Sequence, residues 1–200
     1  MRVWLLRPQA KAVLACLCAL PVLWLFLAAF QDRLGPNPAE ALIRGTGDWT
    51  LRALCLVLAV TPLRVITRTP ALARFRRLLG LNVFAYATLH LLCYAWLDMG
   101  LEVADIAKDI AKRPFILVGF AATMLLLLLA ATSFQRAQRW LGAKRWQALH
   151  RAVYGVAVLA ILHFYWMRSG KQDFAEVATY AAVLGLLLGW RVWHASLKRR

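Results

Sequence analysis

The chain has 200 residues, of which 62% are hydrophobic and only 17% are charged, and its formal net charge is +16. Its apolar residues form long runs, which a water-soluble domain could not hide, so the composition excludes a soluble globular fold. Lipid offers no hydrogen-bond partners to the backbone, so spanning segments must be helical. We therefore expect an all-α integral membrane protein, a six-helix bundle that forms a single transmembrane domain over residues 1–200.

Six apolar runs are long enough to cross a membrane. The first follows a basic start and has no convincing cleavage site, so we expect a retained helix rather than a signal peptide. The predicted spans are 12–30, 50–66, 78–97, 115–134, 148–167 and 177–195.

Positive charge is distributed unevenly between the two sides of these spans. One side receives both termini and the loops 64–77 and 135–151, with 17 of the 25 Lys and Arg residues and no acidic residue. The other side holds all nine acidic residues. By the positive-inside rule, both termini are cytoplasmic. The basic balance therefore indicates membrane topology, and we expect no nucleic-acid partner.

The first outward loop, residues 31–49, is rich in Gly and Pro, and we expect Gly45-Thr46-Gly47 to form a turn. The following inward loop ends in a basic group at the mouth of the third span, made by Arg74, Arg76 and Arg77. These side chains could meet anionic lipid head groups. They could also pair with an anionic cofactor edge, such as haem propionates or a flavin phosphate. Both interpretations stay open.

Two histidines lie deep in different spans. His90 is twelve residues from the cytoplasmic end of the third span, roughly 18 Å deep, and His163 lies fifteen residues into the fifth. Both imidazoles thus reach the outer half of the membrane. This is the geometry of a haem iron held by two neutral imidazoles from two helices. For His163 the alternative is a buried neutral histidine that holds no cofactor.

A third histidine, His150, precedes His163 by thirteen residues, about 20 Å along a helix, so these two cannot ligate one metal. We expect His150 near the cytoplasmic surface, as an interfacial residue or a ligand of a second cofactor. His194 lies at the same face and is an interfacial residue or a partner of His150. Three tyrosines near these positions could orient the rings or simply pack: Tyr94, Tyr154 and Tyr165.

The outward loop at 97–114 combines apolar and acidic residues at helical spacing. It predicts a short amphipathic helix on the outer surface, either a packing element or an acidic landing site for a partner. The residues concerned are Val103, Ile106 and Ile110 with Glu102, Asp105 and Asp109.

Several stretches resemble one family. They are TPLR at 61–64, RRLLGLNVFAYATLH at 76–90, RPF at 113–115, SFQRAQRWLGAKRWQALHRAVY at 133–154 and HFYW at 163–166. Residues 60–167 are similar to the MsrQ family, also called YedZ, which is related to the membrane domains of ferric reductases and NADPH oxidases.

The resemblance implies a haem b protein of the bacterial inner membrane that passes electrons outward to MsrP. That partner is a periplasmic molybdenum-cofactor enzyme that reduces methionine sulfoxide in oxidised proteins. Family members take electrons from the quinone pool or from a cytosolic flavin reductase, and FMN is implied as a second cofactor. His90, His150 and His163 match the family's haem-associated histidines.

One departure concerns the number of haems. Oxidase-type relatives carry two histidines on the third helix and two on the fifth, whereas Arg76 and Arg77 occupy the corresponding positions before His90. We therefore expect one haem, with a second possible only if His150 finds another partner or binds haem alone. His150 could instead serve a flavin or quinone site.

The sequence shows no nucleotide-binding motif and leaves no room for a flavin or nicotinamide domain. We therefore expect an electron-transfer subunit that needs an outside donor and does not itself act on methionine sulfoxide. One rival is a self-standing ferric reductase-type cytochrome. The other, a cofactor-free transporter or assembly scaffold, predicts polar residues inside the spans, and the sequence has few.

Overall fold

The computed structural model describes residues 4–170 and 172–197. Within these ranges every regular element is helical and no strand is present, so the all-α prediction is confirmed. The chain divides into two compact units, one that ends at Glu102 and one that begins at Val103. Five basic residues of the charge count lie outside the described ranges: Arg2, Lys171, Lys198, Arg199 and Arg200.

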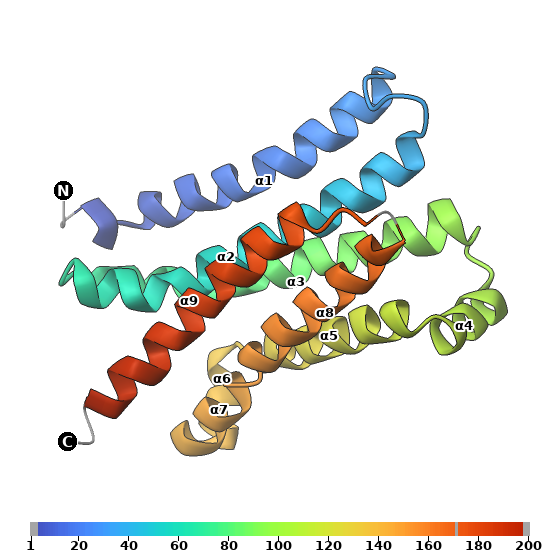
Figure 1. Ribbon diagram of the computed structural model, residues 1–200. Coiled ribbons are helices and arrows are strands. Elements are labelled where there is room, and N and C mark those ends of the chain that lie inside the picture. The colour runs from blue at the N-terminus through green and yellow to red at the C-terminus, as the bar shows by residue number, and fades with distance from the viewer. Residues whose placement is uncertain (1–3, 171, 198–200) are drawn as a thin grey trace. The chain divides into compact units, whose positions relative to one another are not determined.

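The first unit is built around two long antiparallel helices, α2 and α3, with α1 beside them (Figure 1). Its elements in chain order are η1 (Trp4–Leu6), α1 (Pro8–Phe30), α2 (Pro38–Ile66), η2 (Pro70–Phe75), α3 (Arg76–Cys93) and the π-helical turn η3 (Tyr94–Asp98).

The second unit is built around the antiparallel helices α5 and α8, and α9 returns along α8 (Figure 1). Its elements are α4 (Val103–Lys112), α5 (Pro114–Ala131), α6 (Gln135–Leu141), α7 (Ala143–His150), α8 (Val153–Ser169) and α9 (Ala175–Leu197). The short amphipathic helix expected in the 97–114 loop is present as α4.

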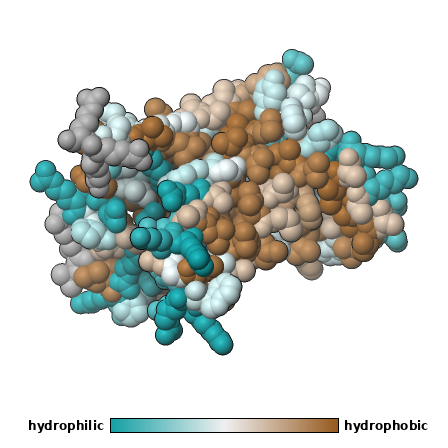
Figure 2. Space-filling model, turned by 90° about the horizontal axis from the view of Figure 1, so that it is seen from below, coloured by the Kyte–Doolittle hydropathy of each residue, from teal (hydrophilic) through white to brown (hydrophobic). Residues whose placement is uncertain are grey.

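Six helices of the described part of the chain are long and apolar enough to cross a membrane, as predicted. Their bounds are Pro8–Phe30, Pro38–Ile66, Pro70–Asp98, Pro114–Ala131, Ala143–Ser169 and Ala175–Leu197. Much of their apolar surface is exposed, for example Leu23 at 62% and Leu186 at 75%. On the face drawn in Figure 2, hydrophobic side chains predominate and hydrophilic ones gather toward the ends. Such a surface requires lipid as its solvent.

The predicted start of the second span is wrong, because α2 begins twelve residues earlier, at Pro38 rather than at residue 50. Asn37 caps the helix by accepting a hydrogen bond from the Glu40 backbone N–H at 3.1 Å, and proline at the first helical position is already held at a helical φ. The expected turn at Gly45-Thr46-Gly47 is therefore also wrong, since these residues lie inside α2.

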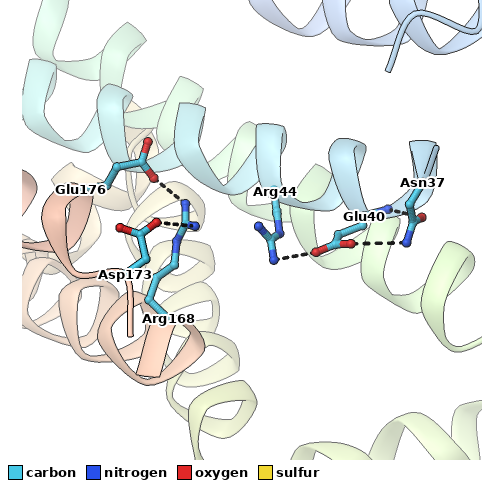
Figure 3. Close-up of polar contacts among 6 residues, drawn as sticks. All are labelled: Asn37, Glu40, Arg44, Arg168, Asp173 and Glu176. Carbon is cyan, nitrogen blue, oxygen red and sulfur yellow. Dashed lines mark hydrogen bonds and ion pairs between the residues drawn. The ribbon is translucent and has the colours of Figure 1, made fainter. Parts of the chain in front are cut away.

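Each unit has a basic end and an acidic end. In the first unit, Val60 of α2 packs with Ala10 and Leu79 at the starts of α1 and α3. The Arg74 guanidinium donates to the Leu5 carbonyl at this basic end, over 2.9 Å. At the opposite end of α2, Glu40 pairs with Arg44 at 2.5 Å (Figure 3).

The second unit repeats this polarity. The Trp146 indole N–H donates to the Thr132 carbonyl at 2.9 Å, which joins α7 to the end of α5 within the basic 135–151 segment. At the other end, Arg168 of α8 pairs with Asp173 at 3.4 Å and also with Glu176 of α9 (Figure 3). These contacts close the turn between α8 and α9.

Candidate functional site

His90 is held against α2 by its ring nitrogen Nδ1. This atom lies 2.8 Å from the carbonyl oxygen of Ile43 and 3.5 Å from the hydroxyl of Thr46. Thr46 is fully buried, and its hydroxyl lies within donating distance of the Leu42 carbonyl, at 2.8 Å. Because a carbonyl only accepts, Nδ1 carries the proton, and the lone pair of the neutral ring lies on Nε2.

His163 has the same arrangement in the other unit. Its Nδ1 lies 2.6 Å from the carbonyl oxygen of Phe115 on α5. The Phe115 ring stands beside the imidazole, with 6.0 Å between the ring centroids. By the same reasoning, His163 donates from Nδ1 and carries its lone pair on Nε2.

Each imidazole also lies over a glycine one helical turn beyond the carbonyl that it contacts. His90 lies over Gly47, four residues after Ile43, and His163 lies over Gly119, four residues after Phe115. Residues four apart share one face of a helix, so carbonyl and glycine act together. We call the Ile43 carbonyl with Gly47 the His90 seat, and the Phe115 carbonyl with Gly119 the His163 seat.

Neither seat was predicted from the sequence. The available signal was a glycine inside a long apolar helix, which indicates a packing or functional constraint. It was misread at Gly47 as part of a turn. The acceptors of the two Nδ1 atoms are backbone carbonyls rather than the tyrosines considered above: Tyr165 stacks on Phe174, and Tyr154 lies under the guanidinium of Arg191.

Both seats have the chemistry that haem iron requires of an axial imidazole. A metal-binding histidine donates its other ring N–H to a carbonyl or carboxylate, which fixes the tautomer and raises the basicity of the ligating nitrogen. Haem needs only two such ligands from the protein. Among the described residues no group of three or more His, Cys, Asp or Glu side chains could hold a bare metal ion. Each imidazole, within its own unit, therefore has the tautomer that an axial haem ligand needs.

His150 is held differently. Its Nε2 lies 3.2 Å from the hydroxyl of Thr132, which is within donating distance of the Leu128 carbonyl, at 2.8 Å. When that hydroxyl donates to Leu128, it accepts from Nε2, and the lone pair lies on Nδ1. The ring stacks on Trp146 with 4.1 Å between centroids. His150 thus differs from His90 and His163 in both tautomer and surroundings.

The remaining candidates lie at the basic ends. Arg77 is exposed in the first turn of α3, whereas the neighbouring Arg74 is engaged with the Leu5 carbonyl. His194 stacks on Trp190, with 4.8 Å between ring centroids and 8° between the planes.

Each seat lies toward the acidic end of its own unit. His90 precedes Asp98, the last residue of its span, by eight residues, about 12 Å of helix. His163 precedes Ser169 by six residues, about 9 Å. Their carbonyl partners lie correspondingly near the starts of α2 and α5.

Residues 46–161 match the family described as ferric reductase like transmembrane component. The chain is 66% identical to the protein-methionine-sulfoxide reductase heme-binding subunit MsrQ of Polaromonas naphthalenivorans, over 98% of this chain and 90% of that protein. The chain belongs to the MsrQ family.

Other MsrQ relatives are more distant but still similar over most of their length. The protein of Ralstonia nicotianae is 55% identical over 88% of this chain and 82% of its own. That of Bordetella pertussis is 53% identical over 84% of this chain and 81% of its own. No solved structure matches the chain.

MsrQ membership and the six long apolar helices together make the chain a multi-pass membrane protein. The region that matches the transmembrane family contains His90, His150 and both seat glycines, whereas His163 lies two residues beyond its end. The similarity to the Polaromonas relative covers nearly the whole chain.

Proposed function

We propose that this protein is a haem b subunit that transfers electrons across the bacterial inner membrane to a periplasmic MsrP-like molybdenum enzyme, for repair of methionine sulfoxide in oxidised periplasmic proteins. The observation that carries the proposal is the pair of imidazoles, each with Nδ1 against a backbone carbonyl and its lone pair on Nε2. The names of the MsrQ relatives, which describe heme-binding subunits of a methionine-sulfoxide reductase, support it.

His90 and His163 are the proposed axial ligands of one haem. A bound haem supplies a one-electron carrier. The protein's part is to present both Nε2 atoms, to keep each Nδ1 proton on its carbonyl, and to surround the rings with apolar helices.

The charge distribution supports the direction of transfer. With the basic ends on the cytoplasmic side, as the positive-inside rule requires, both chain termini are cytoplasmic. His90 and His163 then lie toward the periplasmic side, since each is near the acidic end of its unit. Electrons would leave on the side where a periplasmic partner docks.

At the cytoplasmic side we propose a second cofactor site around His150, with Arg77 as a candidate for an anionic cofactor edge. FMN or a second haem are the candidates there, and the quinone pool or a cytosolic flavin reductase is the donor. Thirteen residues and the break between α7 and α8 separate His150 from His163, so we treat the two sites as distinct. The chain itself would not act on methionine sulfoxide.

A second candidate function is a self-standing ferric reductase. The match to the ferric reductase like transmembrane component favours it. This function would be identified by steady reduction of chelated ferric iron by the isolated subunit with an electron donor. The MsrP route instead requires the periplasmic enzyme for net turnover.

The test is spectroscopic and uses the full chain purified in detergent. Haem and flavin are quantified per polypeptide, and reduced-minus-oxidised spectra are recorded for the native chain and for a His163→Ala variant. We expect a low-spin haem b spectrum that the variant loses. A native chain without haem, or an unchanged spectrum in the variant, would refute the proposal.

A further inference from the structure

A β-carbon at either Gly47 or Gly119 would lie against a histidine ring of the neighbouring helix. A β-carbon built on Gly119 would lie 2.7 Å from Nδ1 and 2.8 Å from Cε1 of His163. At Gly47 the corresponding distances to His90 are 3.2 Å and 3.1 Å. Contacts below 3.0 Å are essentially never made by real β-carbons, so a side chain at 119 must displace the ring. At 47 the contact is tight but less severe.

The two close approaches coincide with the two hydrogen bonds. The imidazole reaches the Phe115 carbonyl because its ring lies directly on the backbone of α5, and the ring of His90 reaches Ile43 in the same way on α2. A β-carbon would push either ring away from the carbonyl that fixes its tautomer. Glycine is the residue that permits such close approach, at the cost of helix propensity.

The glycines inside the two helices that carry the histidines are not crowded. No atom lies within 4 Å of a β-carbon built on Gly80 in α3 or on Gly155 in α8, the helices that carry the histidines. Gly45 of α2 is crowded by the Leu25 side chain at 2.8 Å, which is not a histidine. The contact with an imidazole is therefore specific to positions 47 and 119.

We propose that Gly47 and Gly119 are positioning residues for the two haem-ligating imidazoles: the missing β-carbon lets each ring lie on the neighbouring helix, keep its Nδ1–H bond and hold Nε2 in one orientation. This inference rests on the proposed haem function and deepens it. The tighter contact at Gly119 makes His163 the more sensitive ligand. Replacement of the glycine hydrogen by a methyl group, as in Gly119→Ala, is then enough to change the ligand field of the iron.

The experiment compares four alanine variants of the full chain in detergent: Gly119→Ala and Gly47→Ala with Gly155→Ala and Gly80→Ala as matched controls. The readouts are haem per polypeptide, electron paramagnetic resonance of the ferric form and the midpoint potential. We expect Gly119→Ala to shift the signal from low-spin toward high-spin or to lose haem, Gly47→Ala to do so less, and both controls to match the native chain. A Gly119→Ala spectrum and potential equal to those of Gly155→Ala would overturn the proposal.

Imidazole replacement tests the same point without the tethered ring. In His163→Gly, free imidazole should restore the low-spin spectrum. In the double variant His163→Gly with Gly119→Ala, the affinity for free imidazole should fall about tenfold or more, because overpacking by a methyl group opposes binding. Equal affinity in the two variants would contradict the proposal.

A glycine variant that does not accumulate in the membrane still tests the proposal. If Gly119→Ala alone does not accumulate, removal of the ring in the double variant should restore protein to the level of His163→Gly, and failure to do so would contradict the proposal. If His90→Ala and His163→Ala leave the native haem spectrum unchanged, the proposed function fails. If they abolish it while the glycine variants match their controls, only the positioning role fails.

Discussion

The Nδ1 atom of His163 lies 2.6 Å from the carbonyl oxygen of Phe115, and the same bond joins His90 to Ile43 at 2.8 Å in the other unit. The two helix pairs differ in sequence, yet each holds its imidazole by the same kind of hydrogen bond. In each, the ring donates to a carbonyl near the start of the partner helix. A neutral histidine buried in an apolar segment without a partner would be costly, and this bond removes that cost at Nδ1.

Removal of either ligand should remove the haem. We expect His90→Ala and His163→Ala each to lower haem per polypeptide several-fold, because one remaining imidazole leaves the iron five-coordinate and weakly held. His194→Ala is the matched control, since His194 stacks on Trp190 near the C-terminal end of α9 and contacts neither seat. Pyridine haemochrome quantification on equal amounts of folded protein measures the effect. Equal losses in all three variants would mean that the haem is not ligated at the two seats.

Thr46 should influence the midpoint potential of the proposed haem, because its hydroxyl and the His90 ring contact the same carbonyl oxygen. Its hydroxyl lies 2.9 Å from the Ile43 carbonyl, the same acceptor that His90 uses. In Thr46→Val that competition disappears, the His90 Nδ1–H bond strengthens, and the more electron-rich imidazole should lower the midpoint potential. Thr50→Val is the control, because the Thr50 hydroxyl donates to the Thr46 carbonyl at 2.8 Å.

Redox titration of both threonine variants measures this effect. Thr46→Val should titrate at a lower potential than the native protein, whereas Thr50→Val should titrate at the native potential. A raised potential in Thr46→Val, or equal shifts in both variants, would contradict the shared-acceptor interpretation.

The long apolar runs predicted the six helices well, because a spanning segment must satisfy its backbone internally. They could not predict the start of α2, since residues 38–49 are mixed in polarity and Gly45 and Gly47 resemble turn residues. The Asn37 cap and Pro38 were local signals that would have moved the boundary. The break between α7 and α8 after His150 was also not predicted, because the apolar pattern continues through it.

The candidate site was predictable only in part. Depth along a helix follows from residue number, so the position of His90 and His163 toward one end of their spans could be predicted from the sequence. The carbonyls of Ile43 and Phe115 carry no sequence signal, because every residue has one. Which carbonyl and which glycine meet a given ring depends on how α2 packs on α3 and α5 on α8, and that packing is tertiary.

Arg168 should stabilise the junction between α8 and α9. Its side chain is only 13% exposed, pairs with Asp173 and Glu176, and lies over the Phe164 ring at 5.4 Å. Arg168→Met should lower stability by about 1–2 kcal/mol, since charge-assisted hydrogen bonds are lost while the half-exposed carboxylates regain water.

The matched control for Arg168 is Arg44→Met. Arg44 is more exposed and pairs with Glu40 one turn away, a type of pair worth only about 0.3–0.5 kcal/mol. Thermal unfolding in detergent and proteolysis of the 170–174 turn report the difference. Equal destabilisation by the two substitutions would show that the Arg168 contacts add nothing beyond a surface pair.

His150 should be independent of the haem held by His90 and His163. His150→Ala removes the stacking on Trp146 and the contact with Thr132, which His150 makes thirteen residues and one helix break before His163. We expect the low-spin signal of the His90 and His163 haem to remain, whatever happens to a second cofactor. Paramagnetic resonance of the variant, beside flavin and total haem content, measures this. Disappearance of that signal would mean that His150 is one of its ligands.

The two polar ends of each unit should face opposite sides of the membrane. Gly35 and Gly142 adopt positive φ in exposed connections, at the acidic end of the first unit and the basic end of the second. A single cysteine at either position, in a chain whose four native cysteines are replaced by alanine, should react differently with a membrane-impermeant maleimide. We expect labelling at 35 from the periplasmic side of intact cells and at 142 only after the membrane is opened, because basic loops are retained in the cytoplasm. Labelling at 142 in intact cells would reverse the topology and place both histidine seats on the cytoplasmic side, where they could not pass electrons to a periplasmic enzyme.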